Sequence, residues 1–112
     1  MQIIKRANAN KFSASSTTTI WEYFTNDKSI SGAMVQINGR YPEKGFAYNE
    51  VSKELAFVVS GKGEIIQPAG ENKIDIGDVI LLQPNERFAW EGKLTIFMAT
   101  SPKFNPGQHK LT

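Results

Sequence analysis

Short runs of alternating hydrophobic and polar residues cover most of the chain. In KLTIFMAT (93–100), apolar residues recur at every second position, and ELAFVVSG (54–61) contains a continuous apolar run; both patterns are typical of strands that pack against a core. The runs are rich in β-branched and aromatic residues, which favour strands. About nine runs predict strands: 17–24, 33–39, 45–49, 54–61, 63–68, 72–77, 78–82, 87–92 and 93–100. No stretch has helical spacing over a length that predicts a helix.

Turn residues separate these runs at intervals of roughly ten residues, a spacing that predicts an antiparallel sandwich or barrel. They lie at 38–39, 61–63, 68–70, 77–78, 84–85 and 91–92. The GKG at 61–63 is interpreted as a hairpin turn rather than a phosphate loop, because no Lys-Ser/Thr pair follows it. Phe57 and Val58 lie on opposite faces of one predicted strand, and we expect both to be largely buried.

The chain is expected to form a single domain over residues 1–112, with a core at about 17–100. The tails, 1–12 and 101–112, are less regular, and the second is expected to run over the surface. The apolar residues of strand 17–24 suggest an exposed barrel edge. An apolar edge strand invites pairing with another chain, so we expect a homodimer.

Composition narrows the class of protein. Of the 112 residues, 40% are hydrophobic and 21% charged, as in a globular protein. The net charge is +2 and the basic residues are dispersed, so no nucleic-acid partner is expected. No apolar run approaches the ~20 residues of a membrane span, and the N-terminus has no signal-peptide core. Without cysteine, disulfides and thiolate chemistry are excluded, and a cytoplasmic location is expected.

Two stretches resemble the sequence motifs of the cupin family. In ELAFVVSGKGEI, Glu54 starts a strand that reaches Gly61, and in IDIGDVILLQPNERFAW the pair at 77–78 opens an apolar strand that ends at a proline. The resemblance covers roughly residues 33–100. It implies an all-β fold, an antiparallel β-barrel of the jelly-roll type. Many cupins hold a divalent metal there, through three histidines and a glutamate.

The metal-binding histidines of that family are replaced in this sequence. Counting from the motif residues, the first two histidine positions fall on Tyr48 and Glu50, and the third falls on Phe88. First-row transition metals prefer imidazole or thiolate ligands at such a site. We therefore expect a degenerate metal site and no cofactor. If a divalent metal is bound, its ligands would be Glu50, Glu54 and His109, the chain's single histidine.

Glu50 and Glu54 are the candidate catalytic residues. They share strand parity with Tyr48, so all three are expected to face the barrel interior. Two carboxylates ~5 Å apart at an effective dielectric of ~20 repel by about 3 kcal/mol. A shared proton, a cationic side chain or a bound cation would relieve that repulsion, and the pKa of one glutamate should rise. The alternative is that Glu50 caps a turn and pairs with Lys44 or Lys53 at the surface.

Aromatic residues form the candidate ligand-binding set. Tyr48, Phe88 and Trp90 are expected around the glutamates, with Tyr23 as a further candidate. Aromatic rings stack on sugars and other rings, although at alternating strand positions they also commonly fill a core.

These residues leave functions of different classes open. The favoured one is a binding barrel for a small polar molecule such as a carbohydrate or a carboxylate. The alternative is a small isomerase- or lyase-type enzyme that uses Glu50, Glu54 and His109 for acid–base chemistry or cation binding. A third alternative is a structural dimer whose barrel is filled by its own side chains.

Overall fold

The computed structural model describes residues 1–112 as nine strands and two 3-10 helices, with no α-helix. The elements in chain order are η1 (Arg6–Asn8), β1 (Asn10–Ser15), β2 (Thr18–Tyr23), β3 (Ser31–Tyr41), β4 (Ala47–Asn49), β5 (Lys53–Gln67), β6 (Gly70–Asp75), β7 (Val79–Leu82), β8 (Ala89–Ser101), η2 (Pro106–Gln108) and β9 (His109–Leu111). The all-β class predicted from the sequence is confirmed.

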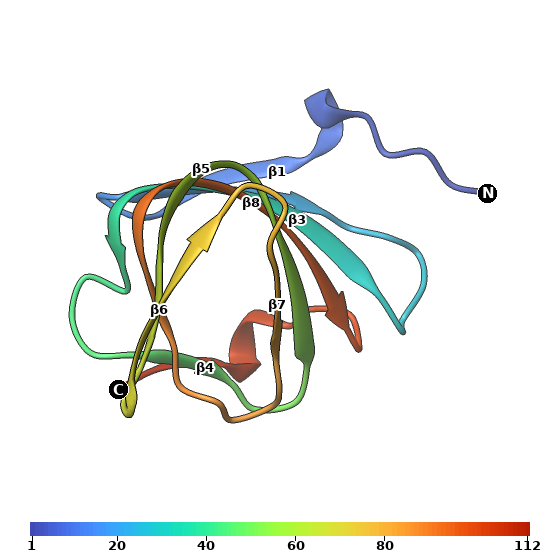
Figure 1. The fold of residues 1–112 in the computed structure, drawn as a ribbon. Coiled ribbons are helices and arrows are strands. Elements are labelled where there is room, and N and C mark those ends of the chain that lie inside the picture. The colour runs from blue at the N-terminus through green and yellow to red at the C-terminus, as the bar shows by residue number, and fades with distance from the viewer.

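One seven-stranded antiparallel sheet makes most of the molecule. Its strand order is β1-β2-β3-β8-β5-β6, and β7 pairs with β5 beside β6. A two-stranded sheet of β4 and β9 forms the rest. In Figure 1, β5 and β8 arch over the top of the molecule, and β4 crosses below them. The curved sheet and the small sheet therefore enclose a barrel interior.

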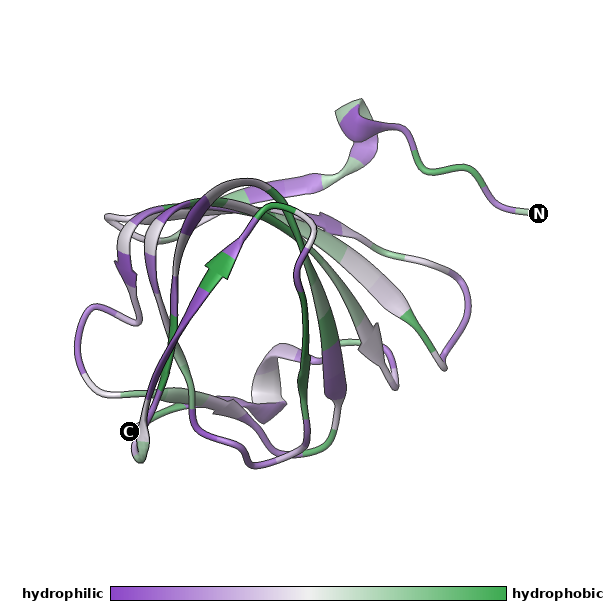
Figure 2. Cartoon of the chain, in the orientation of Figure 1, coloured by the Kyte–Doolittle hydropathy of each residue, from purple (hydrophilic) through white to green (hydrophobic).

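The alternation of the sequence sets which side chains enter that interior. Along β8, Leu94, Ile96 and Met98 are buried, whereas the residues between them are half-buried or exposed. Figure 2 shows hydrophobic and hydrophilic segments following one another along the strands, while β7 is hydrophobic over most of its length. Alternation of period two is what a sheet with one face on a core requires.

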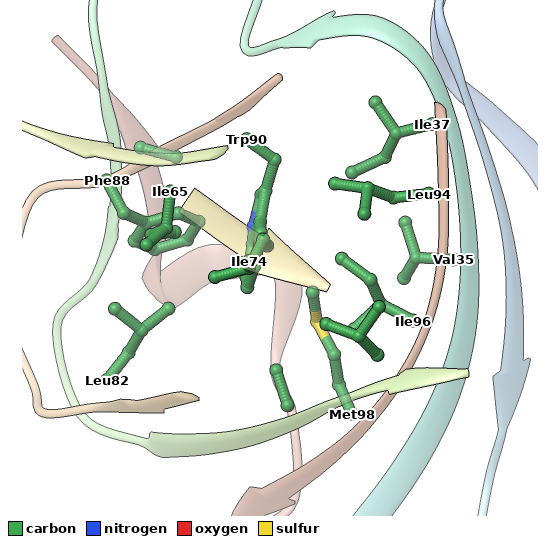
Figure 3. Close-up of a cluster of buried hydrophobic side chains, with 13 residues drawn as sticks. Val35, Ile37, Ile65, Ile74, Leu82, Phe88, Trp90, Leu94, Ile96 and Met98 are labelled. Carbon is green, nitrogen blue, oxygen red and sulfur yellow. The ribbon is translucent and has the colours of Figure 1, made fainter. Parts of the chain in front are cut away.

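Thirteen of the buried hydrophobic side chains form one cluster that joins strands far apart in the sequence. Figure 3 shows Trp90 at its centre, with Phe88 and Ile65 on one side and Leu94 and Ile37 on the other. The Trp90 side chain is almost fully buried, at 1% exposure, and packs edge-on against Phe88. This cluster holds the two sides of the barrel together.

The outer face of β5 differs from our expectation. Val58 is fully buried, as predicted, but the prediction that Phe57 is largely buried is wrong, because 44% of it is exposed. Its neighbours in register, Val79 on β7 and Phe97 on β8, are also exposed. No element of the chain covers this side of the sheet, so alternate residues of β5 face outward.

Three predicted turns lie inside long strands. β5 continues through the glycines at 61 and 63, and β3 and β8 likewise continue through 38–39 and 91–92. Gly39, Gly92 and Gly63 lie in register across β3, β8 and β5, and we call them the glycine row. A Cβ atom on Gly63 would lie 2.1 Å from the Glu91 backbone oxygen. The glycine row thus permits a close approach of arched strands rather than a reversal of the chain.

Both tails contribute strands, which the sequence did not predict. β1 pairs along β2, so the strand at 17–24 has neighbours on both sides and is not the free edge that we expected. The homodimer stays a prediction, which light scattering tests against the 12.5 kDa monomer mass. β9 pairs with β4 and completes the small sheet of the barrel wall. No helix of the structure has the length and hydrophobicity needed to cross a membrane.

Candidate functional site

A cavity of about 390 Å³ opens between the main sheet and the C-terminal segment. Its volume lies in the range of ~300–1,000 Å³ that is usual for small-molecule sites. Thirteen of the 22 residues that line it are hydrophobic. The polar and aromatic groups used below are Tyr41, Glu54, Phe88, Trp90, Phe104 and His109. A mostly apolar wall with a few polar groups is the usual composition of a ligand or active site.

Glu54 is the buried acid of this cavity. It lies near the start of β5, faces inward and is only 5% exposed. Asn49 Nδ2 donates a hydrogen bond of 2.7 Å to its Oε1, whereas its Oε2 is buried without any partner. Burial raises the pKa of Glu54, and the hydrogen bond from Asn49 opposes that effect. The carboxyl group is therefore held by a hydrogen bond at one oxygen and unpaired at the other.

Asn49 connects this carboxyl to a second pair of polar side chains. Its Oδ1 lies 2.8 Å from His109 Nδ1, and His109 Nε2 lies 2.9 Å from the Tyr41 hydroxyl. The rings of Tyr41 and His109 also stack, with centroids 6.1 Å apart. Four residues from β3, β4, β5 and β9 thus form one hydrogen-bonded chain along the cavity wall.

The chemistry of the amide fixes the direction of every bond in this chain. The Glu54 carboxyl oxygen accepts from the Asn49 NH₂ group, so the Asn49 carbonyl oxygen must face His109. A carbonyl oxygen only accepts, which places the imidazole proton on Nδ1. In the neutral ring, Nε2 is then an acceptor, and the Tyr41 hydroxyl donates to it. The amide thereby selects one tautomer of His109.

Burial keeps both ring groups uncharged. It lowers the pKa of His109, because the charged imidazolium loses hydration. It also raises the pKa of Tyr41, and the charge of Glu54 adds to that rise. Near neutral pH, the pair is therefore a phenol next to a neutral imidazole whose Nε2 can accept a proton.

The C-terminal segment places His109 through its neighbour Gln108. The buried Gln108 side chain accepts from the backbone N–H groups of Val51 (2.9 Å) and Ser52 (2.7 Å), and its Nε2 donates to Ser52 Oγ (2.7 Å). These bonds fasten the segment to the bend between β4 and β5. Next to this anchor, His109 pairs in register with Asn49. The segment is thus part of the barrel wall rather than a loose surface arm.

The predicted glutamate pair is not assembled, because only Glu54 faces the interior. The Glu50 side chain is about half exposed, and its Oε1 lies 3.9 Å from Lys110 Nζ. The surface alternative for Glu50 therefore applies, with Lys110 as the partner instead of Lys44 or Lys53. Strand parity does not carry from β4 to β5, because residues 50–52 form a bend between them. The repulsion of about 3 kcal/mol that we assumed for the pair accordingly does not arise.

Of the aromatic residues predicted to bind a ligand, some face the cavity and one does not. Phe88, Trp90 and Tyr23 line the cavity, but Tyr48 does not. On β4 the inward positions are Ala47 and Asn49, both buried, so Tyr48 points outward between them. Sequence reasoning missed Tyr41 and Asn49. Parity on β4 could have indicated Asn49 once Ala47 was placed inside, but no sequence signal connects Tyr41 to a histidine 68 positions later.

The donor set does not fit a metal ion. No group of three or more His, Cys, Asp and Glu side chains is placed to hold one. Of the proposed ligands, Glu50 lies at the surface, and both ring nitrogens of His109 are hydrogen-bonded. Of the motif positions, Tyr48 points outward and Phe88 is apolar. Glu54 therefore stands without the partners that a cupin metal centre needs.

Comparison with known proteins identifies the fold. The sequence matches no protein-family model and no curated protein sequence. Among solved structures, Pac13 of Streptomyces, described as a nucleoside dehydratase, superposes with a TM-score of 0.88 at 19% identity, covering 100% of this chain and 91% of its own. Variants of Pac13 have been solved with uridine.

Two further solved structures are similar. Ectoine synthase from P. lautus has a TM-score of 0.78 at 12% identity, covering 100% of this chain and 90% of its own. KdgF from Halomonas sp. has a TM-score of 0.75 at 12% identity, covering 94% and 96%. All three are cupin-type barrel proteins. The fold of this chain is a cupin-like barrel, as the sequence predicted.

Proposed function

We propose that this protein is an enzyme that transfers protons on a small molecule bound in the barrel cavity. The observation that carries the proposal is Glu54, a buried carboxyl group that lines the cavity and has one oxygen without a partner. A buried carboxyl with a raised pKa keeps its proton closer to neutral pH than an exposed one does. Such groups serve as general acids in active sites.

Tyr41 and His109 supply the second proton-transfer group. Asn49 separates them from Glu54, and an amide does not relay protons readily, so the two units act independently. A proton taken from the substrate by the Tyr41 oxygen can be matched by transfer of the phenol proton to His109 Nε2. An acid and a base on one cavity wall are the set that proton-transfer chemistry requires.

These roles correspond to elimination of water or to isomerisation. The Tyr41–His109 pair would take a proton from substrate carbon, and Glu54 would give its proton to a leaving hydroxyl or to a carbonyl oxygen. In the elimination, the C–O electron pair leaves with the hydroxyl as water, and the C–H pair forms the new double bond. The fold similarity to Pac13, described as a nucleoside dehydratase, supports a reaction of this class.

Deuterium exchange at carbon tests the proposal across several classes of candidate substrate. A panel of nucleosides, sugars and ketones is incubated with the protein in D₂O, and deuterium uptake at carbon is followed by NMR. We expect uptake in at least one compound and a loss of ~10²-fold or more in Glu54→Gln and Tyr41→Phe. Glu71→Gln, a change at an exposed residue of β6, should retain the rate. Full uptake by Glu54→Gln would contradict the assignment.

The second candidate is a binding protein for the same class of small molecule. The observation in its favour is Trp90, whose side chain lines the cavity and whose buried indole N–H has no partner and no part in proton transfer. On this alternative, no compound that binds would exchange deuterium.

A further inference from the structure

The charges around the cavity restrict which molecules can enter it. The lining includes two glutamates, Glu22 and Glu54, and no lysine or arginine. The lysines next to lining residues in the sequence lie elsewhere. Lys110 lies beside Glu50 at the surface, Lys103 donates to the Thr25 backbone oxygen, Lys11 lies over the Trp21 ring, and Lys53 is exposed. A phosphate or carboxylate bound here would lose its hydration and meet no compensating cation.

Trp90 gives the cavity a requirement for a hydrogen-bond acceptor. Its side chain is 1% exposed, and its Nε1 is buried without a partner. An indole N–H only donates, and a buried donor without an acceptor is costly. Figure 3 shows the Trp90 ring among apolar side chains, none of which has an oxygen or nitrogen acceptor. Because Nε1 is covered, a molecule in the cavity can supply the missing acceptor only with a small movement of the covering side chains.

The surrounding wall favours a carbonyl group over a hydroxyl group as that acceptor. A hydroxyl would bring its own proton, which needs a second acceptor among apolar neighbours such as Phe88. A carbonyl oxygen brings none. Aromatic side chains around it, Tyr41 and Phe104 among them, offer flat faces to a planar ring.

We infer that the cavity binds an uncharged, planar molecule whose carbonyl oxygen accepts from Trp90 Nε1, and that it rejects carboxylates and phosphates. This inference rests on the proposed function only in using the same cavity. Of the ligands expected from the sequence, it disfavours the carboxylate. Glu54 supplies no positive charge in either protonation state, and its unpaired oxygen can donate to a carbonyl oxygen when it carries a proton or accept from an N–H group when it does not.

Benzamide and benzoate test the charge requirement, because they are planar and nearly equal in size. Binding to the wild-type protein at pH 7.5 is followed by ligand-observed NMR. We expect benzamide to bind at least ~30-fold more tightly than benzoate. Uridine and its 5′-monophosphate form a second, larger pair, for which the same order is expected. Equal or tighter binding of either anion would overturn the inference, as would a failure of both neutral probes to bind at about 10 mM.

Trp90→Phe tests the carbonyl contact against a matched control. The variant keeps an aromatic ring but loses the N–H, and we expect about tenfold weaker binding of benzamide. Trp21→Phe changes the other tryptophan, which packs under Arg6 and outside the cavity, and should leave binding unchanged. Unchanged binding in Trp90→Phe would overturn the carbonyl assignment and indicate that water satisfies the N–H.

These measurements separate the inference from the proposed function. Binding selectivity is an equilibrium property of the wild-type cavity, whereas deuterium exchange reports on Glu54. If benzoate binds as tightly as benzamide while exchange still depends on Glu54, only the ligand class fails. If the selectivity holds while Glu54→Gln exchanges at the full rate, only the proposed reaction fails.

Discussion

Replacing Glu54 by glutamine should change how the stability of the protein depends on pH. Glutamine keeps the size of the side chain and can still accept from Asn49, so the change removes mainly the titrating group. Because burial raises the pKa of Glu54, the folded state binds this proton more tightly than the unfolded state does. The resulting stabilisation is full below the ordinary value of 4.5 and is lost as the pH rises through the folded pKa.

The size of the effect follows from the titration of one proton. The free energy of unfolding can fall by at most about 1.4 kcal/mol per pH unit from this group. In a domain of this length, 1 kcal/mol corresponds to roughly 4 °C in Tm, so the loss is up to about 6 °C per pH unit. Glu54→Gln does not undergo this loss. The two proteins should have similar Tm values near pH 4.5, and the variant should become the more stable one above it.

Thermal unfolding by circular dichroism between pH 4.5 and 8.5 measures this difference. Glu50→Gln is the matched control, because it changes the other glutamate of the same stretch, which lies at the surface 3.9 Å from Lys110. Its ion pair is half exposed, so the control should cost no more than about 0.5 kcal/mol and keep the wild-type pH dependence. Parallel curves for wild type and Glu54→Gln across the whole range would refute the reasoning, because they would mean that the carboxyl is not buried.

Three further predictions concern the core, His109 and the glycine row. Val58→Ala should cost about 2–3 kcal/mol in urea unfolding, and more than Phe57→Ala, although the latter removes more atoms, because Val58 is fully buried and Phe57 is 44% exposed. Burial lowers the pKa of His109, so its contribution to stability is full above 6.5 and is lost as the pH falls through the folded pKa; His109→Gln should abolish that acid-side loss of Tm. Gly63→Ala should cost about 2 kcal/mol or more, because its Cβ would lie 2.1 Å from a backbone oxygen, whereas Gly107→Ala, with nothing nearer than 3.4 Å, should cost little. Equal costs for the two glycine changes would contradict the steric argument.

The fold was largely predictable because the hydrophobic pattern within each short stretch of sequence indicates a strand. The apolar runs at 54–61 and 93–100 predicted strands that lie within β5 and β8, and Glu54 and Val58 face inward as expected, whereas Phe57 does not. The turn predictions were wrong at the glycines inside β3, β5 and β8. In a single sequence, a glycine that ends a strand cannot be distinguished from one that lets two arched strands approach each other. Only the register of three strands, which sets Gly63 opposite Gly92, distinguishes the two.

The sequence predicted correctly only those site residues whose orientation depends on a single strand. Glu54, Phe88 and Trp90 lie on or beside long strands, and they reached the cavity as expected. Glu50 did not reach the cavity, because the chain bends directly after β4. The alternation of inward and outward side chains along a strand does not continue through such a bend. Tyr41 depends on a contact with the opposite end of the chain, which hydrophobic pattern does not encode.

The glycine row has a consequence for how such a barrel can evolve. Gly39, Gly63 and Gly92 do not line the cavity, yet Gly63 and Gly92 determine how closely the arched middles of β5 and β8 approach. The approach of the strands and the chemistry of the wall outside the hydrophobic cluster therefore depend on separate sets of positions. Lining residues that are not part of the cluster, such as Tyr23 and Phe104, can be exchanged for others without rebuilding the barrel, and a new reaction can arise at unchanged size. Proteins described as a dehydratase and a synthase share this architecture at 12–19% identity, as such a separation would allow.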